Sequence, residues 1–157
     1  MIEFQIPGYD ALQLENLVLD YNGTLALDGS PIQGVKDRLN RMGELMSVCV
    51  VTADTFGTVR DSLEGLDIQI RILHGDGNQS EQKAEIVRDL GPASTVAIGN
   101  GRNDGLMLQT AGLAIAVIGH EGASPDTVSS ADIVTTDIRD ALDLLLVPGR
   151  LKATLRR

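Results

Sequence analysis

Cysteine and aromatic residues are nearly absent from this chain of 157 residues, which has one Cys, two Phe, two Tyr and no Trp. A single cysteine excludes an internal disulfide and a multi-cysteine metal site. Cys49 lies inside the apolar run MSVCVVT, where we expect it to be buried. The core must therefore be built from Val, Ile, Leu, Ala and Met, which suits a parallel sheet covered by helices.

Long apolar runs and an excess of basic residues are also missing. No segment reaches the ~18 apolar residues that span a bilayer, and the start, MIEFQIPGYD, lacks the basic and apolar regions of a signal peptide. We therefore expect a cytoplasmic protein. The 13 basic and 22 acidic residues give a net charge of −9. This charge disfavours nucleic acid and anionic membranes as partners, because their phosphate groups would be repelled.

The length and the 43% hydrophobic content predict one domain over residues 1–157. Neither an internal repeat nor a linker interrupts it. We place the core at about residues 16–146 and a basic tail at 147–157. The tail sequence PGRLKATLRR has four basic residues and no acidic one, which predicts a solvated end or a helix packed on a neighbouring subunit.

Short apolar runs alternate with stretches of helical period along the chain, as in a three-layer α/β/α, Rossmann-like, doubly wound and mainly parallel sheet. An N-terminal hairpin is expected from residues 3–6 and 12–14. The strands of the main sheet are predicted at residues 17–19, 47–51, 68–73, 95–98, 113–118 and 133–135.

Helix signals separate these strands. Ser30 followed by Pro31 predicts an N-cap and a first helical residue. Phe56, Val59 and Leu63 predict the apolar stripe of a second helix. Further helices are expected over residues 78–90, 103–112 and 137–146.

Four polar features follow the predicted strands. Asp20 ends the first strand, Thr52 ends the second, Lys83 lies in the helix after the third, and GNGRND (residues 99–104) follows the fourth. Loops at the carboxyl ends of parallel strands converge on one crevice, where ligands bind. We therefore expect these residues to meet.

The stretches DYNGT, VVTAD and GNGRND, with the isolated Lys83, resemble in this order the haloacid-dehalogenase-like (HAD-like) phosphotransferases. The stretch VAIGNGRNDGLMLQTAGLAIAVIGHEGASPDTVSSADIVTT is similar to the phosphorylation domain of P-type ATPases, which reads GDG-x-ND, an Ala-rich run and ADIV. The resemblance covers about residues 16–146. It implies a HAD-like fold without a cap domain, and a soluble P-type ATPase-like phosphatase or phosphotransferase that uses Mg²⁺.

The chemistry fits the residue types. A carboxylate at a strand tip can attack a phosphoryl group and form an acyl phosphate, so Asp20 is the predicted nucleophile. The Thr52 hydroxyl and the Lys83 ammonium can stabilise the developing charge, and with Asn22 they complete the catalytic set. The predicted ligands of Mg²⁺ are Asp20, Asn22 through its backbone carbonyl, Asn100 and Asp104. The predicted substrate-binding residues are Gly23, Thr24, Ala53, Asp54 and Asn103.

Two residues depart from the family pattern. Most phosphatases of the family have a second Asp where this chain has Asn22, and P-type ATPases have Thr. An amide cannot exchange a proton, so a general acid/base contribution of ~10²–10⁴-fold is missing and hydrolysis should be slow. Asn100 replaces a metal-binding Asp, which should weaken the metal site unless Asp104 moves inward.

The substrate is expected to be a small phosphorylated compound or a nucleotide. No cap domain fits between the motifs, so the site should be open, and capless relatives commonly form dimers or tetramers that cover it. Two other functions stay open. Asn22 and Asn100 are compatible with a catalytically silent scaffold. A receiver-like phosphoacceptor module also has a strand-end Asp, a Thr and a Lys, but it needs an acidic pair before that Asp, which this sequence lacks.

Overall fold

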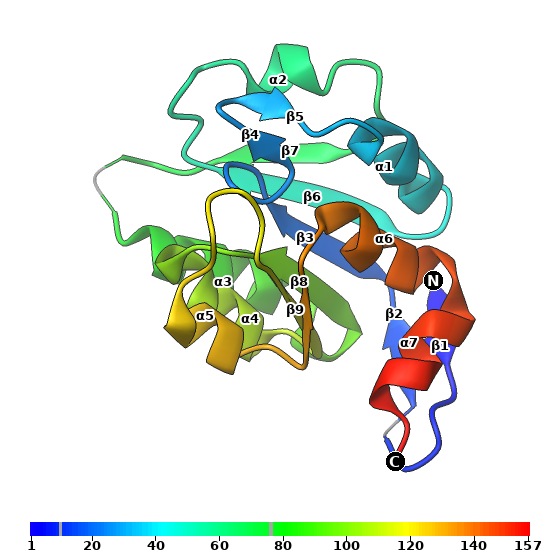
Figure 1. Cartoon of the computed structure of the whole chain (residues 1–157). Helices are drawn as coiled ribbons and strands as arrows, with labels where there is room; N and C mark the ends of the chain where they lie inside the picture. The colour runs from blue at the N-terminus through cyan, green and yellow to red at the C-terminus, as the bar shows by residue number, and fades with distance from the viewer. Residues whose placement is uncertain (10, 76) are drawn as a thin grey trace.

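The computed structural model describes residues 1–9, 11–75 and 77–157, and a six-stranded sheet lies at its centre (Figure 1). The strand order is β10-β9-β8-β3-β6-β7, and every neighbouring pair is parallel. The strands of this sheet are β3 (Asn16–Asp20), β6 (Ser47–Thr52), β7 (Gln69–Ile72), β8 (Thr95–Gly99), β9 (Leu113–Val117) and β10 (Ile133–Thr135). The predicted parallel α/β sheet is confirmed.

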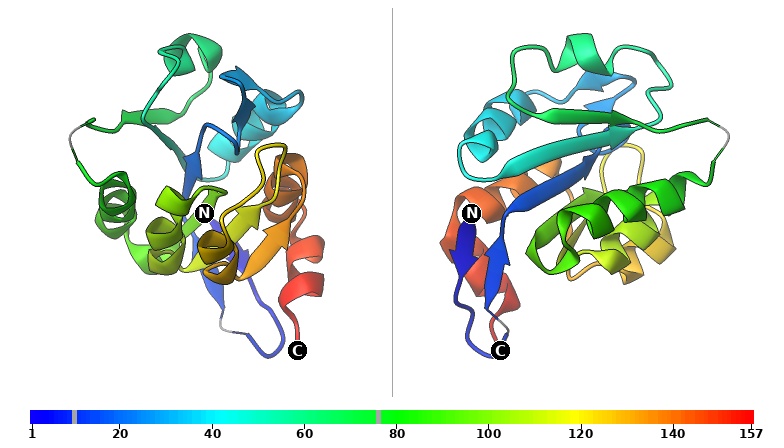
Figure 2. Two further views of the ribbon diagram at one scale, coloured as in Figure 1. Left: turned by 60° about the vertical axis from the view of Figure 1, so that its left-hand side comes forward. Right: turned by 180° about the vertical axis from the view of Figure 1, so that it is seen from behind.

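Helices cover both faces of the sheet (Figure 2). One face packs against α3 (Gln79–Leu90), α4 (Gly105–Thr110) and α5 (Pro125–Ser129). The other packs against α1 (Val35–Gly43) and α6 (Ile138–Leu146). A short helix, α2 (Val59–Ser62), precedes β7. None of the helices in the described ranges combines the length and the apolar character that crossing a membrane requires.

The alternation of side chains along each strand divides the core in two. In β3, Leu17 and Leu19 pack on the side of α1 and α6, whereas Val18 packs on the side of α3 and α4. The core layer between the sheet and helices α3 and α4 contains small residues of the sheet, including Ala97. It also contains Cys49, which is buried as predicted. Small side chains let the helices of this layer approach the sheet closely, and α3 carries Lys83.

The prediction that Ser30 caps a helix was wrong. Ser30 and Pro31 form a short strand, β5 (Ser30–Pro31), antiparallel to β4 (Ala26–Leu27). Asp28 and Gly29, with φ of 51° and 81°, make the tight turn between them, and Asp-Gly is a strong hairpin signal. Helix α1 begins only after Gly34, whose φ is 85°.

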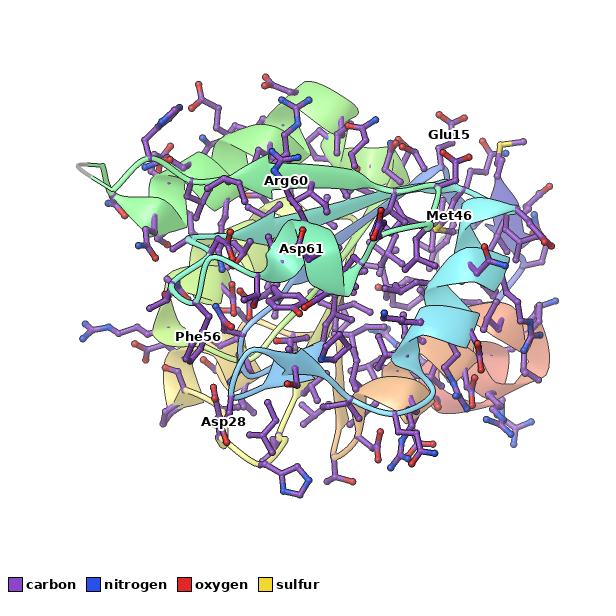
Figure 3. All side chains as sticks on the ribbon, turned by 90° about the horizontal axis from the view of Figure 1, so that it is seen from above. Glu15, Asp28, Met46, Phe56, Arg60 and Asp61 are labelled. Atoms are coloured by element: carbon purple, nitrogen blue, oxygen red, sulfur yellow. The ribbon has the colours of Figure 1, made fainter. Side chains whose placement is uncertain are left out.

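Helix α2 is shorter than the predicted second helix, and Phe56 lies outside it. Phe56 is 57% exposed and lies in the loop before α2, near the tip of the β4–β5 hairpin (Figure 3). Its ring lies against Gly29, with Cγ 3.0 Å from where a Cβ on Gly29 would be. The other two residues of the predicted stripe are buried. Gly57, with φ of 68°, prevents the helix from starting earlier.

The basic tail folds onto its own chain. It forms α7 (Pro148–Leu155), with Leu151 fully buried in the core. The backbone N–H of Arg157 donates to the carbonyl of Pro7 at 3.1 Å, beside the N-terminal hairpin of β1 (Ile2–Phe4) and β2 (Leu12–Leu14) (Figure 1). The hairpin was predicted. The tail is a helix anchored on its own chain through Leu151, while most of its other residues are exposed as expected of a solvated end. Packing of this helix on a neighbouring subunit stays a prediction. The apolar leucines between the basic residues decide this packing.

The order of the strands places a switch point beside β3. From β3 the chain continues to β6 and β7 on one side, then returns to β8 on the other side and proceeds outward to β9 and β10. The loops that leave β3 and β8 therefore diverge and open a crevice at their carboxyl ends, where ligands bind in sheets of this kind.

Candidate functional site

The polar residues predicted from four separate segments meet at this crevice. Asp20, Thr52 and Asn100 come from the ends of β3, β6 and β8, and Lys83 reaches them from α3. They border a pocket of about 200 Å³. The residues that line it are Asp20, Asn22, Thr52, Ala53, Thr55, Gln79, Lys83, Asn100, Gly101, Asn103 and Glu121. Larger hollows of about 410 and 710 Å³ contain none of these residues.

Lys83 joins two buried carboxylates. Its Nζ lies 2.7 Å from Asp20 Oδ1 and 2.6 Å from Asp104 Oδ1, and the Lys83 side chain is 1% exposed. Burial alone would lower the pKa of Lys83, but the charges of Asp20 and Asp104 outweigh it and raise this pKa. Lys83 is therefore charged at neutral pH, and its third ammonium proton is free to bind a phosphoryl oxygen.

The Asp20 carboxyl is held in a low-polarity position next to a like charge. Burial and the neighbouring Asp104 raise the pKa of Asp20 to about 7, although Lys83 and a hydrogen bond from Thr24 act in the opposite direction. Asp20 is thus only partly ionised near pH 7 in the protein alone. A further positive charge next to it would favour the carboxylate, the form that can act as a nucleophile.

Asp104 holds the surrounding loop in place. While its Oδ1 accepts from Lys83, its Oδ2 accepts from the backbone N–H groups of Asn100 at 3.0 Å and Gly101 at 2.9 Å. Asp104 is fully buried and does not line the pocket. For Asp104 to reach a metal ion, as the sequence suggested, these hydrogen bonds would have to break. In this structure it positions Lys83 and the turn after β8.

Two oxygen atoms next to the pocket share one hydroxyl proton. Thr24 Oγ1 lies 3.0 Å from Asp20 Oδ2 and 3.1 Å from Asn100 Oδ1. A hydroxyl has a single proton, so it can satisfy only one of these acceptors at a time. A carboxylate oxygen and an amide oxygen that converge in this way are suitable donors for Mg²⁺.

The Asn22 side chain is incompletely satisfied. Its Nδ2 lies 3.5 Å from Thr52 Oγ1, a long hydrogen bond, and its Oδ1 is buried without a partner among the described residues. An unpaired buried acceptor costs about 1–3 kcal/mol. Such a cost is usually accepted where a ligand or a functional role requires the group, which makes Asn22 a polar group available to a ligand.

Thr52 is oriented by the loop that follows it. The backbone N–H of Asp54 donates to Thr52 Oγ1 at 2.9 Å, which leaves the hydroxyl proton free to point into the pocket. The Asp54 carboxylate instead accepts from the N–H groups of Thr58 and Val59, both at 3.1 Å, and caps α2. Asp54 is outside the pocket lining, so its contacts are those of a positioning residue.

Of the other predicted substrate-binding residues, Ala53 and Asn103 line the pocket, whereas Gly23 and Thr24 are not among its lining residues. Asn103 Nδ2 donates to Gln79 Oε1 at 3.1 Å, which joins the turn after β8 to the start of α3. Sequence reasoning missed Thr55, Gln79 and Glu121. Glu121 follows β9 at the same edge of the sheet, so the rule that selected the other loops could have found it.

Gly23→Ala is expected to destabilise the protein by about 1–3 kcal/mol and to distort the pocket. Gly23 has φ of 78°, and an added Cβ would lie 2.7 Å from Asn100 Nδ2 and collide with the Glu121 carboxylate. Urea unfolding measures the loss. The control is Gly65→Ala, where φ is 84° but no atom lies within 4 Å. Equal losses in the two variants would contradict the crowding argument.

No family model matches the chain. Uncharacterized protein MJ0073 of Methanocaldococcus jannaschii is 50% identical over 84 residues, which are 51% of this chain and 90% of that protein. A soluble P-type ATPase-like phosphatase of the same organism is 23% identical over 155 residues, 95% of this chain. This chain spans only 56% of that second protein.

Solved structures share the fold. A 3-deoxy-D-manno-octulosonate 8-phosphate phosphatase from Moraxella catarrhalis, in complex with magnesium ion, phosphate ion and KDO, has a TM-score of 0.65 at 19% identity, covering 85% of this chain and 86% of its own. A phospho-aspartyl intermediate analogue of phosphoserine phosphatase has a TM-score of 0.62 at 19% identity. The match covers 85% of this chain and 99% of the phosphoserine phosphatase chain. The chain thus belongs to the family of uncharacterized protein MJ0073, and its fold is that of the HAD-like hydrolases.

Proposed function

We propose that this protein is a Mg²⁺-dependent phosphohydrolase or phosphotransferase that forms an aspartyl phosphate on Asp20. The observation that carries the proposal is the Asp20 carboxylate at the switch point of the sheet, with Lys83 Nζ at 2.7 Å and the Thr52 hydroxyl on the same pocket. The likeness to a soluble P-type ATPase-like phosphatase and to phosphatase structures with bound magnesium or a phospho-aspartyl analogue supports it.

The residues present fit a magnesium ion. Asp20 Oδ2 and Asn100 Oδ1, which share the Thr24 hydroxyl, would bind it together with the backbone carbonyl of Asn22. Among the described residues, no group of three or more His, Cys, Asp or Glu side chains gathers as a metal site. The ion would therefore keep several water ligands, as Mg²⁺ commonly does. When bound, it supplies positive charge next to the phosphoryl group.

In the first step, an Asp20 oxygen attacks phosphorus and the bond from phosphorus to the leaving-group oxygen breaks. The leaving group takes the bonding electron pair and needs a proton, which Asn22 cannot provide. Thr52 and Lys83 donate hydrogen bonds to the phosphoryl oxygens, where negative charge accumulates. In the second step, water attacks phosphorus, phosphate leaves, and the Asp20 carboxylate is restored. Because no residue at position 22 deprotonates this water, we expect the aspartyl phosphate to persist.

The pocket of about 200 Å³ is smaller than the roughly 300–1,000 Å³ of sites that enclose a drug-sized ligand. The leaving group of a small phosphorylated compound or a nucleotide would therefore extend beyond it. We propose that a second copy of the chain covers this part of the substrate in a dimer or tetramer.

Asn22→Asp is expected to increase the rate of aspartyl-phosphate hydrolysis by about 10²-fold, because it restores a general acid and base. The protein is incubated with acetyl phosphate and Mg²⁺, and the decay of the hydroxylamine-sensitive acyl phosphate is followed together with turnover of p-nitrophenyl phosphate. Asn40→Asp makes the same change at an exposed position of α1 and should leave both rates as in the wild type.

The same experiment separates the alternatives. No labelling and no turnover in the wild type or in Asn22→Asp would reject the enzyme and favour a scaffold. A stable beryllium fluoride complex without turnover in either form would favour a phosphoacceptor module.

A further inference from the structure

Glu121 occupies the tip of a tight turn that follows β9 at the edge of the sheet where the site lies. The turn is closed by a hydrogen bond from the N–H of Gly122 to the carbonyl of Gly119 at 2.9 Å. Glu121 lines the same pocket as Asp20 and Asn100. Glu121 belongs to none of the sequence motifs and takes part in neither step of the proposed reaction.

Asn100 holds this turn against the site. Its side-chain Nδ2 donates to the carbonyl of Gly122 at 3.1 Å, and its backbone carbonyl accepts from the N–H of Ser124 at 2.8 Å. An ionised Asp at position 100 could not donate to the Gly122 carbonyl and would repel it. Asn100 in place of an Asp therefore removes a negative charge from position 100. Its amide also holds the turn that carries Glu121, through the hydrogen bond to Gly122.

The Glu121 carboxylate is close to the oxygen atoms that would bind the metal ion. Around the position that a Cβ on Gly23 would take, Asn100 Nδ2 lies at 2.7 Å, Asn100 Oδ1 lies at 3.1 Å, and Glu121 Oε2 is the nearest atom. Within the described part of the chain, no ion pair or hydrogen bond neutralises the Glu121 side chain. A free carboxylate thus lies next to the amide that replaces one.

The net charge of the site also favours a role for Glu121 in binding a cation. With Asp20 ionised, the form that a nearby cation favours, Asp20, Asp104 and the charged Lys83 together carry one net negative charge, which balances half of the charge of a divalent cation. With Glu121 the site carries two. Mg²⁺ is typically held by one or two carboxylates together with water and phosphate oxygens, and Asp20 with Glu121 would provide this set.

We propose that Glu121 supplies the negative charge that Asn100 lacks, as a ligand of the divalent cation or of one of its bound water molecules. The proposal rests on the metal dependence of the proposed function. It means that the acidic metal-binding position has been transferred from the turn after β8 to the turn after β9, with Asn100 as the residue that connects them.

Titration calorimetry with Mg²⁺ alone tests this, with Mn²⁺ binding followed by electron paramagnetic resonance as a second readout. Glu121→Gln keeps the size of the side chain and is expected to weaken Mg²⁺ binding at least about tenfold. Because the side chain is exposed, the Tm of the metal-free variant should match the wild type. Glu44→Gln removes one charge at an exposed position beyond the end of α1, just before β6 starts at the opposite edge of the sheet, and should bind as the wild type does.

The outcomes separate this inference from the proposed function. If the wild type binds Mg²⁺ and Glu121→Gln binds it equally well, the role of Glu121 is rejected while the proposed function stands. If Glu44→Gln weakens Mg²⁺ binding as much as Glu121→Gln does, the effect is one of overall charge, and the role of Glu121 as a ligand is rejected. If the wild type binds neither Mg²⁺ nor Mn²⁺, the metal dependence and this inference fall together.

Discussion

Lys83→Met is expected to lower the free energy of unfolding by about 3–5 kcal/mol, because it leaves buried carboxylates without their cation. Lys83 Nζ lies 2.7 Å from Asp20 and 2.6 Å from Asp104, and the three side chains are almost fully buried. The loss corresponds to a decrease in Tm on the order of 10 °C. Phosphoryl transfer should also be lost, since Lys83 would no longer stabilise the phosphoryl oxygens.

Urea unfolding at several pH values tests the cause. Without Lys83, protonation of the two carboxylates relieves the repulsion, so the variant should lose less stability at pH 5 than at pH 8. Adding Asp104→Asn to Lys83→Met should recover part of the loss, because one buried charge is then removed. Lys36→Met, at an exposed position of α1, is the matched control. A loss that is independent of pH and not relieved by Asp104→Asn would indicate a packing effect instead.

Asp20→Asn is expected to abolish turnover, by at least about 10⁴-fold, as removal of a catalytic nucleophile does elsewhere. The amide has no oxygen that can attack phosphorus, so labelling by acetyl phosphate should disappear as well. A variant that retains an acyl phosphate would show that a different carboxylate is the nucleophile. Asp61→Asn, on the exposed surface of α2, should keep the wild-type rate (Figure 3).

The same variant should be more stable than the wild type in metal-free buffer at pH 8. The pKa of Asp20 is raised from 3.8 to about 7 by burial and by Asp104. The folded wild type therefore binds more protons than the unfolded chain between these values, and its stability falls as the pH rises through this window. Asparagine removes this cost. The advantage of Asp20→Asn should shrink as the pH is lowered towards 4, and a constant difference across the window would contradict the raised pKa.

The order of the elements could be read from the sequence because the signals that define it are local. Short apolar runs between stretches of helical period marked the strands of the sheet. Asn78, where a helix was predicted to begin, accepts from the N–H groups of Ser80 and Glu81 and caps α3. Once a parallel sheet is assumed, the rule that ligands bind at the carboxyl ends of strands brings Asp20, Thr52 and the 99–104 turn together. Their convergence with Lys83 in the structure follows from this topology.

The predictions failed where a competing local signal was stronger, or where a distant segment decides the packing. Ser30 and Pro31 have the pattern of a helix start, but the turn at Asp28 and Gly29 pairs them with β4. The tail contains leucines among basic residues, and only the presence of α6 and the N-terminal hairpin beside it decides that Leu151 is buried.

In the site, too, some features follow from the sequence and others only from the tertiary structure. The residue types that can form an aspartyl phosphate were determined by the sequence, because a carboxylate, a hydroxyl and an ammonium have this chemistry wherever they meet. Only the tertiary structure decided that Asp104 faces Lys83 and the backbone, and that Asn100 holds the turn with Glu121 beside it. Hydrogen bonds between segments far apart in the chain set these orientations, and no local pattern encodes them.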